Sequence, residues 1–292
     1  MAAPLAAERL LQALRAEGVH VVEVGNWRTH NRNSKGPWGP LNGSIVHHTV
    51  TKGTGSTVRI VRDGYADLPG PLCHGMIAKD GRVHLVGWGR TNHAGGGDPR
   101  VLDQVIAESY STRPAPPTKG NANGTDGNAR FYGWECENLG DGKDPWPKAQ
   151  YDAIVRVQAA LCRAHGWSAK SVIGHREWSA DKIDPRGIDM PRLRADVAER
   201  LKHPASWSPS GSAPPKQEDS MAVSDADVKK IADAVVERLL SADRFDAPKD
   251  AADYSDDPKS PQHYWTGRSV FADLVTRVRR IDKTLNAAKK DG

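Results

Sequence analysis

The sequence predicts an α/β domain with a mixed central sheet flanked by helices, followed by a small all-α C-terminal module. Strand and helix patterns alternate up to about residue 200, a Ser/Pro-rich segment follows, and the remaining residues carry helical patterns only. The 292 residues suffice for one large domain or for a medium domain with an appendage. No stretch approaches the ~20 consecutive apolar residues that cross a bilayer, so a membrane span is not expected.

The elements of the first part follow from local patterns. Short apolar, β-branched runs bounded by turn residues predict strands at 44–50 and 132–137, a hairpin over 75–86, and a strand at 171–174. Apolar residues spaced three and four apart predict helices within residues 1–18, over 151–162, and over 190–201. Gly166 is expected to end the second of these helices.

The composition divides the chain into parts. We expect a domain over residues 1–205 with its core at about 40–200, a linker over 206–220, and a module over 221–292. Nine of the fifteen linker residues are Ser, Pro or Gly, which cannot bury a core. The module contains a helical pattern over 224–240 and a heptad seam over 271–285, and these short apolar stripes need a partner surface. Met221, directly after the linker, also suggests a second translation start.

Charge and cysteine content narrow the class of protein. The net charge of +5 is compatible with binding to nucleic acid, a membrane surface or an anionic cell wall, but the basic residues are spread along the chain. Without a basic stripe, nucleic-acid binding is not expected. Three scattered cysteines predict buried free thiols. Charged residues such as Glu8, Arg9 and Arg15 interrupt the first eighteen residues, so we expect no signal peptide and synthesis in a cytoplasm.

Two histidine positions suggest a metal site. The pair His47-His48 lies at the end of one predicted strand, and His175 follows another, with Asp184 nine residues later. Two imidazoles and a carboxylate form a three-ligand zinc set that leaves one coordination position open for catalysis. Because adjacent strand residues point to opposite faces, only one of His47 and His48 can face the metal. The other would lie behind the site or in the core.

Residues 44–185 resemble a known enzyme family in the order and spacing of several sequence blocks. The three main blocks are IVHHT, GWECEN and IGHREWSADKIDP, with supporting blocks CHGMIAKDGRVHLVG and NHAGGG. In these blocks the chain resembles the zinc-dependent N-acetylmuramoyl-L-alanine amidases of type 2. That family includes amidase-type phage lysozymes and peptidoglycan recognition proteins. The resemblance implies their α/β fold, a Zn²⁺ cofactor, and hydrolysis of the bond between N-acetylmuramic acid and L-alanine in peptidoglycan.

The resemblance also implies the metal ligands. His47 matches the first zinc ligand and His175 the second, with His48 as the rival for the first position. Asp184 stands where other members have cysteine. A carboxylate in place of a thiolate leaves more positive charge on the metal and removes an oxidisable sulfur from the site.

Three further residues carry implied roles. Glu135 matches the glutamate that acts as base in one branch of the family, and Glu137 is the alternative base or a neighbour of the site. Another branch of the family uses a tyrosine at the position of Cys73. Because this chain lacks that tyrosine, Glu135 is favoured as the group that transfers the proton. Lys182 matches a family position beside the metal, where its ammonium group would stabilise an oxyanion.

The resemblance also implies that two more histidines line the substrate groove. His93 lies in the NHAGGG block, and His74 lies on the hairpin strand after Cys73. We expect both to contact substrate.

The whole organisation resembles an endolysin of a phage that infects actinobacteria. Such a protein would be made in the host cytoplasm, act on the cell wall and cause lysis. Residues 221–292 would form a homo-oligomer or bind an anionic wall polymer. Two alternatives remain open: a non-catalytic peptidoglycan-binding protein, and a zinc peptidase that cuts within the stem peptide.

Overall fold

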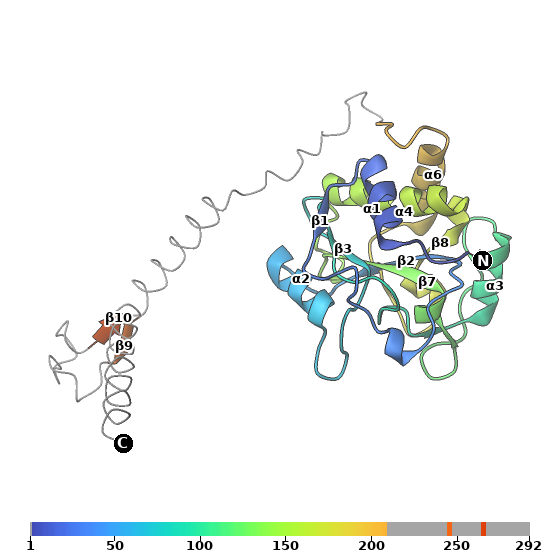
Figure 1. Ribbon diagram of the computed structural model, residues 1–292. Coiled ribbons are helices and arrows are strands. Elements are labelled where there is room, and N and C mark those ends of the chain that lie inside the picture. Colours follow the sequence, from blue (N-terminus) through green and yellow to red (C-terminus); the bar gives the residue numbers. More distant parts are fainter. Residues whose placement is uncertain (1, 209–243, 247–263, 267–292) are drawn as a thin grey trace, which may run out of the picture. The chain divides into compact units, whose positions relative to one another are not determined.

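The computed structural model describes residues 2–208, 244–246 and 264–266. The chain divides into two compact units, residues 1–216 and 217–292. In the first unit, helices pack around a six-stranded sheet (Figure 1). The predicted fold class, an α/β domain with a mixed central sheet flanked by helices, is therefore confirmed.

The sheet has the strand order β1–β4–β3–β7–β2–β8. Only β3 and β4 pair antiparallel, and all other neighbours are parallel. The six strands are β1 (Val21–Glu23), β2 (Gly43–His48), β3 (Gly75–Ile77), β4 (Val83–Leu85), β7 (Phe131–Cys136) and β8 (Val172–Gly174). Because β7, β2 and β8 are parallel neighbours, their carboxyl ends share one edge of the sheet, where α/β proteins commonly bind ligands.

Six α-helices surround this sheet in the described part of the chain. They are α1 (Ala7–Ala16), α2 (Thr54–Asp63), α3 (Pro99–Ala107), α4 (Lys148–His165), α5 (His175–Trp178) and α6 (Met190–Leu201). Helix α4 packs against both α1 and α6, and the three lie together on one side of the sheet (Figure 1). A small second sheet pairs β5 (Gly96–Gly97) with β6 (Thr125–Asp126). None of the described helices is long and apolar enough to cross a membrane.

Alternating side chains of β2 enter different apolar clusters. Val46 belongs to the cluster that contains the buried residues of α1, α4 and α6. Ile45 belongs instead to a cluster with Val101 of α3 and Trp178 of α5. Since strand residues two apart share a face, His47 lies on the α3/α5 side of the sheet and His48 on the α4 side.

The element boundaries agree with the sequence predictions to within a few residues. Helix α6 has the predicted bounds, and α4 ends before Gly166, which adopts a φ of 70°. Strand β2 ends two residues before the predicted Val50. That valine has a φ of 53°, which a β-branched residue in a strand cannot adopt, so the chain turns there.

The C-terminal unit differs from its prediction. Only helices were expected, but the described residues include two short strands, β9 (Arg244–Asp246) and β10 (Tyr264–Thr266), which pair antiparallel. The helices predicted at 224–240 and 271–285 lie outside the described residues. The predicted linker also lies outside them apart from residues 206–208, so the domain boundary stays a prediction.

Candidate metal centre

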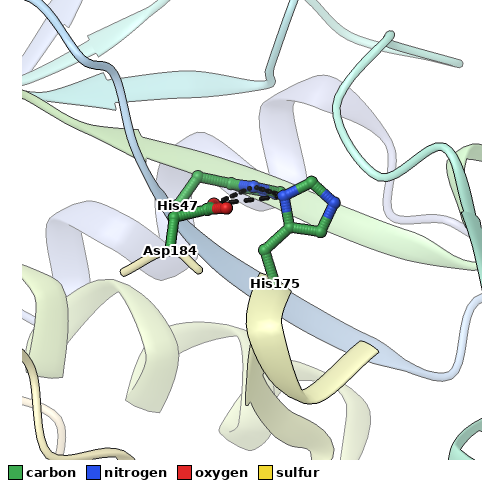
Figure 2. A group of neighbouring side chains, drawn as sticks. All are labelled: His47, His175 and Asp184. Carbon is green, nitrogen blue, oxygen red and sulfur yellow. Dashed lines mark hydrogen bonds and ion pairs between the residues drawn. The ribbon is translucent and has the colours of Figure 1, made fainter. Parts of the chain in front are cut away.

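Three side chains from separate parts of the chain converge at the shared strand edge (Figure 2). His47 lies near the end of β2, His175 is the first residue of α5 directly after β8, and Asp184 lies in the loop that leads to α6. The Nδ1 atoms of the two histidines are 2.9 Å apart, and each lies 3.1 Å from Oδ2 of Asp184. Within the described ranges, this is the one group of three His, Cys, Asp or Glu side chains that converges this closely.

The donor set fits a divalent metal ion. Two imidazole nitrogens and one carboxylate oxygen are ligands that zinc takes in catalytic sites with three protein ligands. All three residues are buried, with exposed fractions of 1% for His47, 4% for His175 and 8% for Asp184. A buried carboxylate needs a positive charge nearby, and a cation bound between the three side chains would supply it.

The electrostatics favour the metal-binding protonation state. Burial and, next, the charge of His175 together lower the pKa of His47 to about 4 against the opposing effect of Asp184, so His47 is neutral at pH 7. Burial alone raises the pKa of Asp184, but hydrogen bonds and charge from the two imidazoles in their protonated forms outweigh it and hold that pKa well below its usual range. A neutral imidazole and an ionised carboxylate are the forms that bind metals.

Glu135 lies beside this group. It pairs in register with His47 on the parallel strands β7 and β2, so both side chains are on the same face. Its Oε2 atom is buried and makes no hydrogen bond within the described residues. Burial, and next the negative charge of Asp184, raise the pKa of Glu135 well above its usual range, whereas Lys182 opposes the shift.

Glu137 is engaged elsewhere. Its two carboxylate oxygens accept hydrogen bonds from the Gly53 backbone N–H (2.8 Å) and the Thr54 hydroxyl (2.7 Å), at the start of α2. Strand β7 ends at Cys136. Glu137 is therefore the first residue after the strand, and strand alternation does not place its side chain beside that of Glu135.

Lys182 and His48 are both associated with the loop that carries Asp184. Lys182 is half-buried in the loop before Asp184, and among the described residues it makes no ion pair. His48 points to the other face of the sheet, where its Nδ1 accepts a hydrogen bond from the Arg186 backbone N–H at 3.1 Å. His48 thereby holds the loop that carries Asp184, but it is not part of the converging group.

His93 and His74 are interior residues. His93 is 7% exposed, and its Nδ1 lies 3.0 Å from Nε2 of His47. His74 is fully buried, with Nε2 2.9 Å from the Gly89 carbonyl and Nδ1 accepting from the Gly133 N–H at 2.9 Å. Burial lowers the pKa of His74 to about 4 and that of His93 well below its usual range. Both rings are thus occupied by contacts within the protein.

Two residues that hold the site were not predicted. Asn128 accepts hydrogen bonds through Oδ1 from the backbone N–H groups of His93 and Ala94, each at 2.8 Å. Arg176 donates from its backbone N–H to the Asp184 carbonyl (2.7 Å) and from its guanidinium to the Pro185 carbonyl (2.9 Å). An asparagine in a Gly-rich turn and an arginine after a histidine carry no sequence signal for such contacts.

A family match covers the segment that carries these side chains. Residues 37–187 match the family model described as N-acetylmuramoyl-L-alanine amidase. None of the curated proteins matches the chain.

A search of solved structures found three similar chains, among others. The endolysin N-acetylmuramoyl-L-alanine amidase LysCS from Clostridium intestinale is 17% identical, covering 61% of this chain and 94% of its own, with a TM-score of 0.38. A structure of AmpD is 19% identical, covering 62% and 97%, with a TM-score of 0.40. AmpDh3 from Pseudomonas aeruginosa, solved with an anhydromuramic pentapeptide, is 18% identical, covering 53% and 59%, with a TM-score of 0.37.

The matched segment spans more than half of the chain and contains all three converging side chains together with Glu135 and Lys182. The chain therefore belongs to the N-acetylmuramoyl-L-alanine amidase family.

Proposed function

We propose that this protein is a zinc-dependent hydrolase that cleaves the amide bond between N-acetylmuramic acid and L-alanine in bacterial peptidoglycan. The observation that carries the proposal is the convergence of His47, His175 and Asp184, with atoms 2.9–3.1 Å apart, beside the buried Oε2 of Glu135, which makes no hydrogen bond within the described residues. Family membership supplies the substrate class, and the site supplies the groups that the reaction needs.

Nδ1 of His47, Nδ1 of His175 and Oδ2 of Asp184 would hold the metal. Zinc would supply Lewis acidity, lowering the pKa of a water molecule from about 15.7 towards about 7 and polarising the carbonyl of the lactyl group. Because the three protein atoms approach from a strand, a helix start and a loop, the rigid sheet edge keeps two of them in place.

Glu135 would act as the base and then as the acid. Its free Oε2 would accept a proton from the attacking water and pass it to the departing nitrogen of L-alanine, since an amine anion is too poor a leaving group. Burial and the nearby charge of Asp184 raise its pKa, which makes its carboxylate more basic than an exposed one.

Lys182 would stabilise the oxyanion of the tetrahedral intermediate. Its charge influences the pKa values of both Glu135 and His47, so its ammonium is within electrostatic reach of the two groups between which the carbonyl would bind. A well-placed donor of this kind contributes roughly 3–4 kcal/mol to transition-state stabilisation. The absence of an ion pair with Lys182 in the described part of the chain leaves the ammonium available.

The remaining predictions concern substrate contact and the biological role. His93 and His74 are buried and bonded within the protein, which supports a positioning role for them in place of substrate contact. We also propose that the protein is a phage endolysin acting on the cell wall, with residues 221–292 as an oligomerisation or wall-binding module. Sedimentation and wall binding of the full chain, against a chain that ends at residue 208, would separate these two roles.

One digestion experiment distinguishes the candidate activities. The purified full chain should carry zinc and release peptides with a free N-terminal L-alanine from purified peptidoglycan, measured by mass spectrometry. A peptidase would cut between amino acids and leave the muramyl bond intact. A binding protein would sediment with the wall and release nothing, and a zinc-loaded chain that does so would refute the proposed activity.

A further inference from the structure

Both imidazole ligands use their second ring nitrogen to contact one short segment. Nε2 of His175 lies 3.1 Å from the carbonyl oxygen of Ala94. Nε2 of His47 lies 3.0 Å from Nδ1 of His93, the preceding residue. The dipeptide His93–Ala94 therefore touches both candidate ligands on the side away from the point where they converge.

The first contact determines the tautomer of His175. A backbone carbonyl can only accept a hydrogen bond, so Nε2 of His175 must carry the proton that is donated to Ala94. In the neutral ring the other nitrogen, Nδ1, then has a free lone pair. That lone pair points at His47 and Asp184, where a metal would bind.

The second contact determines the tautomer of His47 in two steps. Nε2 of His93 lies 3.2 Å from the Phe131 carbonyl and must donate to it. The neutral His93 ring therefore has an acceptor at Nδ1, and that acceptor requires a proton on Nε2 of His47. The lone pair of His47 is then at Nδ1, again facing the convergence point.

The dipeptide itself is fixed from two sides. Oδ1 of Asn128 accepts hydrogen bonds from both backbone N–H groups, each at 2.8 Å. The His93 ring lies against β7 at Gly133, where a side chain has no room because a Cβ atom would be 2.3 Å from the ring. The position of the ring is thus set before any metal binds.

We propose that His93–Ala94, held by Asn128, is a positioning element that presets both imidazole ligands in the tautomer with Nδ1 free for the metal. The inference rests on the proposed function in that it takes His47 and His175 as the zinc ligands. Hydrogen bonds behind metal-bound histidines orient the rings, and losing one typically costs about 10–100-fold in metal affinity. His93 therefore acts through His47 and does not need to touch the substrate.

The tautomers are directly measurable in the metal-free full chain. Long-range ¹H–¹⁵N correlation spectra of protein labelled with ¹⁵N-histidine, at pH 7.5, should show His47 and His175 protonated at Nε2. This readout requires neither zinc nor turnover, so it stands even if the chain proves not to be a zinc enzyme. A neutral ring protonated at Nδ1 and not at Nε2, in either residue of the metal-free wild type, would overturn the proposal.

Two substitutions at His93 test the relay itself. His93→Leu keeps the bulk and removes the acceptor, so zinc affinity should fall about 10–100-fold and His47 should populate both tautomers. His175, whose partner is the Ala94 carbonyl, should keep its tautomer in this variant. In His93→Asn the amide oxygen replaces Nδ1 as acceptor, and most of the affinity should return.

The control and the contradicting results are equally specific. His84→Leu removes another buried histidine, on β4, which bonds to neither ligand, and it should leave zinc affinity unchanged. Wild-type affinity in His93→Leu, or equal losses in His93→Leu and His93→Asn, would refute the relay. If His93→Leu fails to fold, Asn128→Ala, which frees the dipeptide, should lower zinc affinity in its place. Failure of the wild type to bind zinc would instead refute the proposed function.

Discussion

His47 and Glu135 are register partners on the adjacent parallel strands β2 and β7, so a candidate metal ligand and the proposed base stand side by side on one face of the sheet. Neither position depends on a loop, because β2 pairs with β7 and β8, and β7 pairs with β3 and β2. Groups carried by paired strands are held more precisely than groups on loops. Substitutions at these two positions are therefore expected to change the chemistry and leave the backbone in place.

Removal of one ligand charge should abolish metal binding. Asp184→Asn preserves the shape of the side chain but removes the carboxylate that faces both Nδ1 atoms. We expect zinc to fall from one ion per chain to background, measured by inductively coupled plasma mass spectrometry, together with loss of peptide release. His47→Ala and His175→Ala should behave in the same way.

Asp189→Asn is the matched control. This aspartate is exposed five residues further along the chain, and it pairs only loosely with Arg113 at 3.4 Å. It should keep its zinc and its activity. Stoichiometric zinc in Asp184→Asn would show that the carboxylate is not a ligand.

Substitution of the proposed base should separate metal binding from turnover. Glu135→Gln removes the proton acceptor without changing the size of the side chain. We expect full zinc content with about 10²–10⁴-fold lower turnover, the usual contribution of general acid–base catalysis. Turnover of fluorescently labelled peptidoglycan, corrected for zinc content, measures it.

The comparison variant Glu137→Gln should lose stability but keep its turnover, unlike Glu135→Gln. Glu137 accepts two hydrogen bonds at the start of α2, so its loss should lower the free energy of unfolding by about 1–2 kcal/mol. Turnover of the folded protein should be unchanged. A large loss of turnover in Glu137→Gln, with activity retained in Glu135→Gln, would transfer the base role to Glu137.

Local patterns were sufficient for the strands that carry the site. The runs around His47, Glu135 and His175 are apolar, short and bounded by turns, and helices α4 and α6 show clear apolar spacing. Such elements are determined by neighbouring residues, so a single sequence predicts them.

Elements that depend on distant partners were not predicted. The single turn of α5 is held by Glu177, which accepts from the Gly174 N–H and pairs with the buried Arg194 at 2.8 Å. Helix α2 begins where Glu137, more than eighty residues away, accepts from Gly53. The contact between His93 and His47 is likewise nonlocal, and no spacing rule indicates it.

The lysine beside the site should affect turnover more than substrate affinity. Lys182→Met removes the positive charge but keeps most of the length of the side chain. If the ammonium stabilises the oxyanion, kcat should fall about 10²–10³-fold with little change in KM and with zinc retained. Lys182→Arg should recover part of kcat. An increase in KM alone would indicate that Lys182 only binds substrate.

Acid should destabilise the metal-free protein through its buried histidines. Burial lowers the pKa of His74 to about 4, against about 6.5 for an unfolded histidine, so between these values the unfolded chain binds the extra proton. The contribution of His74 to the free energy of unfolding is therefore complete above pH 6.5. It is lost as the pH falls towards 4, by about 3 kcal/mol in total. Protonation of Nδ1 would also break the bond from Gly133.

Urea unfolding of the metal-free chain at several pH values from 4.5 to 7.5 measures this dependence. His74→Asn has no titrating group, and its stability should depend less steeply on pH than that of the wild type. His20→Asn, at an exposed position, should show the wild-type slope. Equal slopes in all three proteins would mean that His74 does not titrate in this range.

A buried cluster of charged residues connects the N-terminal helix α1 to α4 and α6, and its loss should lower the stability of the domain. Glu17, which follows α1 and is fully buried, pairs with Arg200 of α6 at 2.6 Å and with Arg163 of α4 at 3.2 Å. Because Glu17→Ala leaves Arg200 buried without a counter-charge, it should cost about 3–5 kcal/mol in the free energy of unfolding. Glu199 lies on the same helix as Arg200 and forms an exposed ion pair with Lys202. Glu199→Ala removes this pair and should lower the free energy of unfolding by less than about 1 kcal/mol. Similar costs for the two variants in urea unfolding would show that the cluster does not hold these helices together.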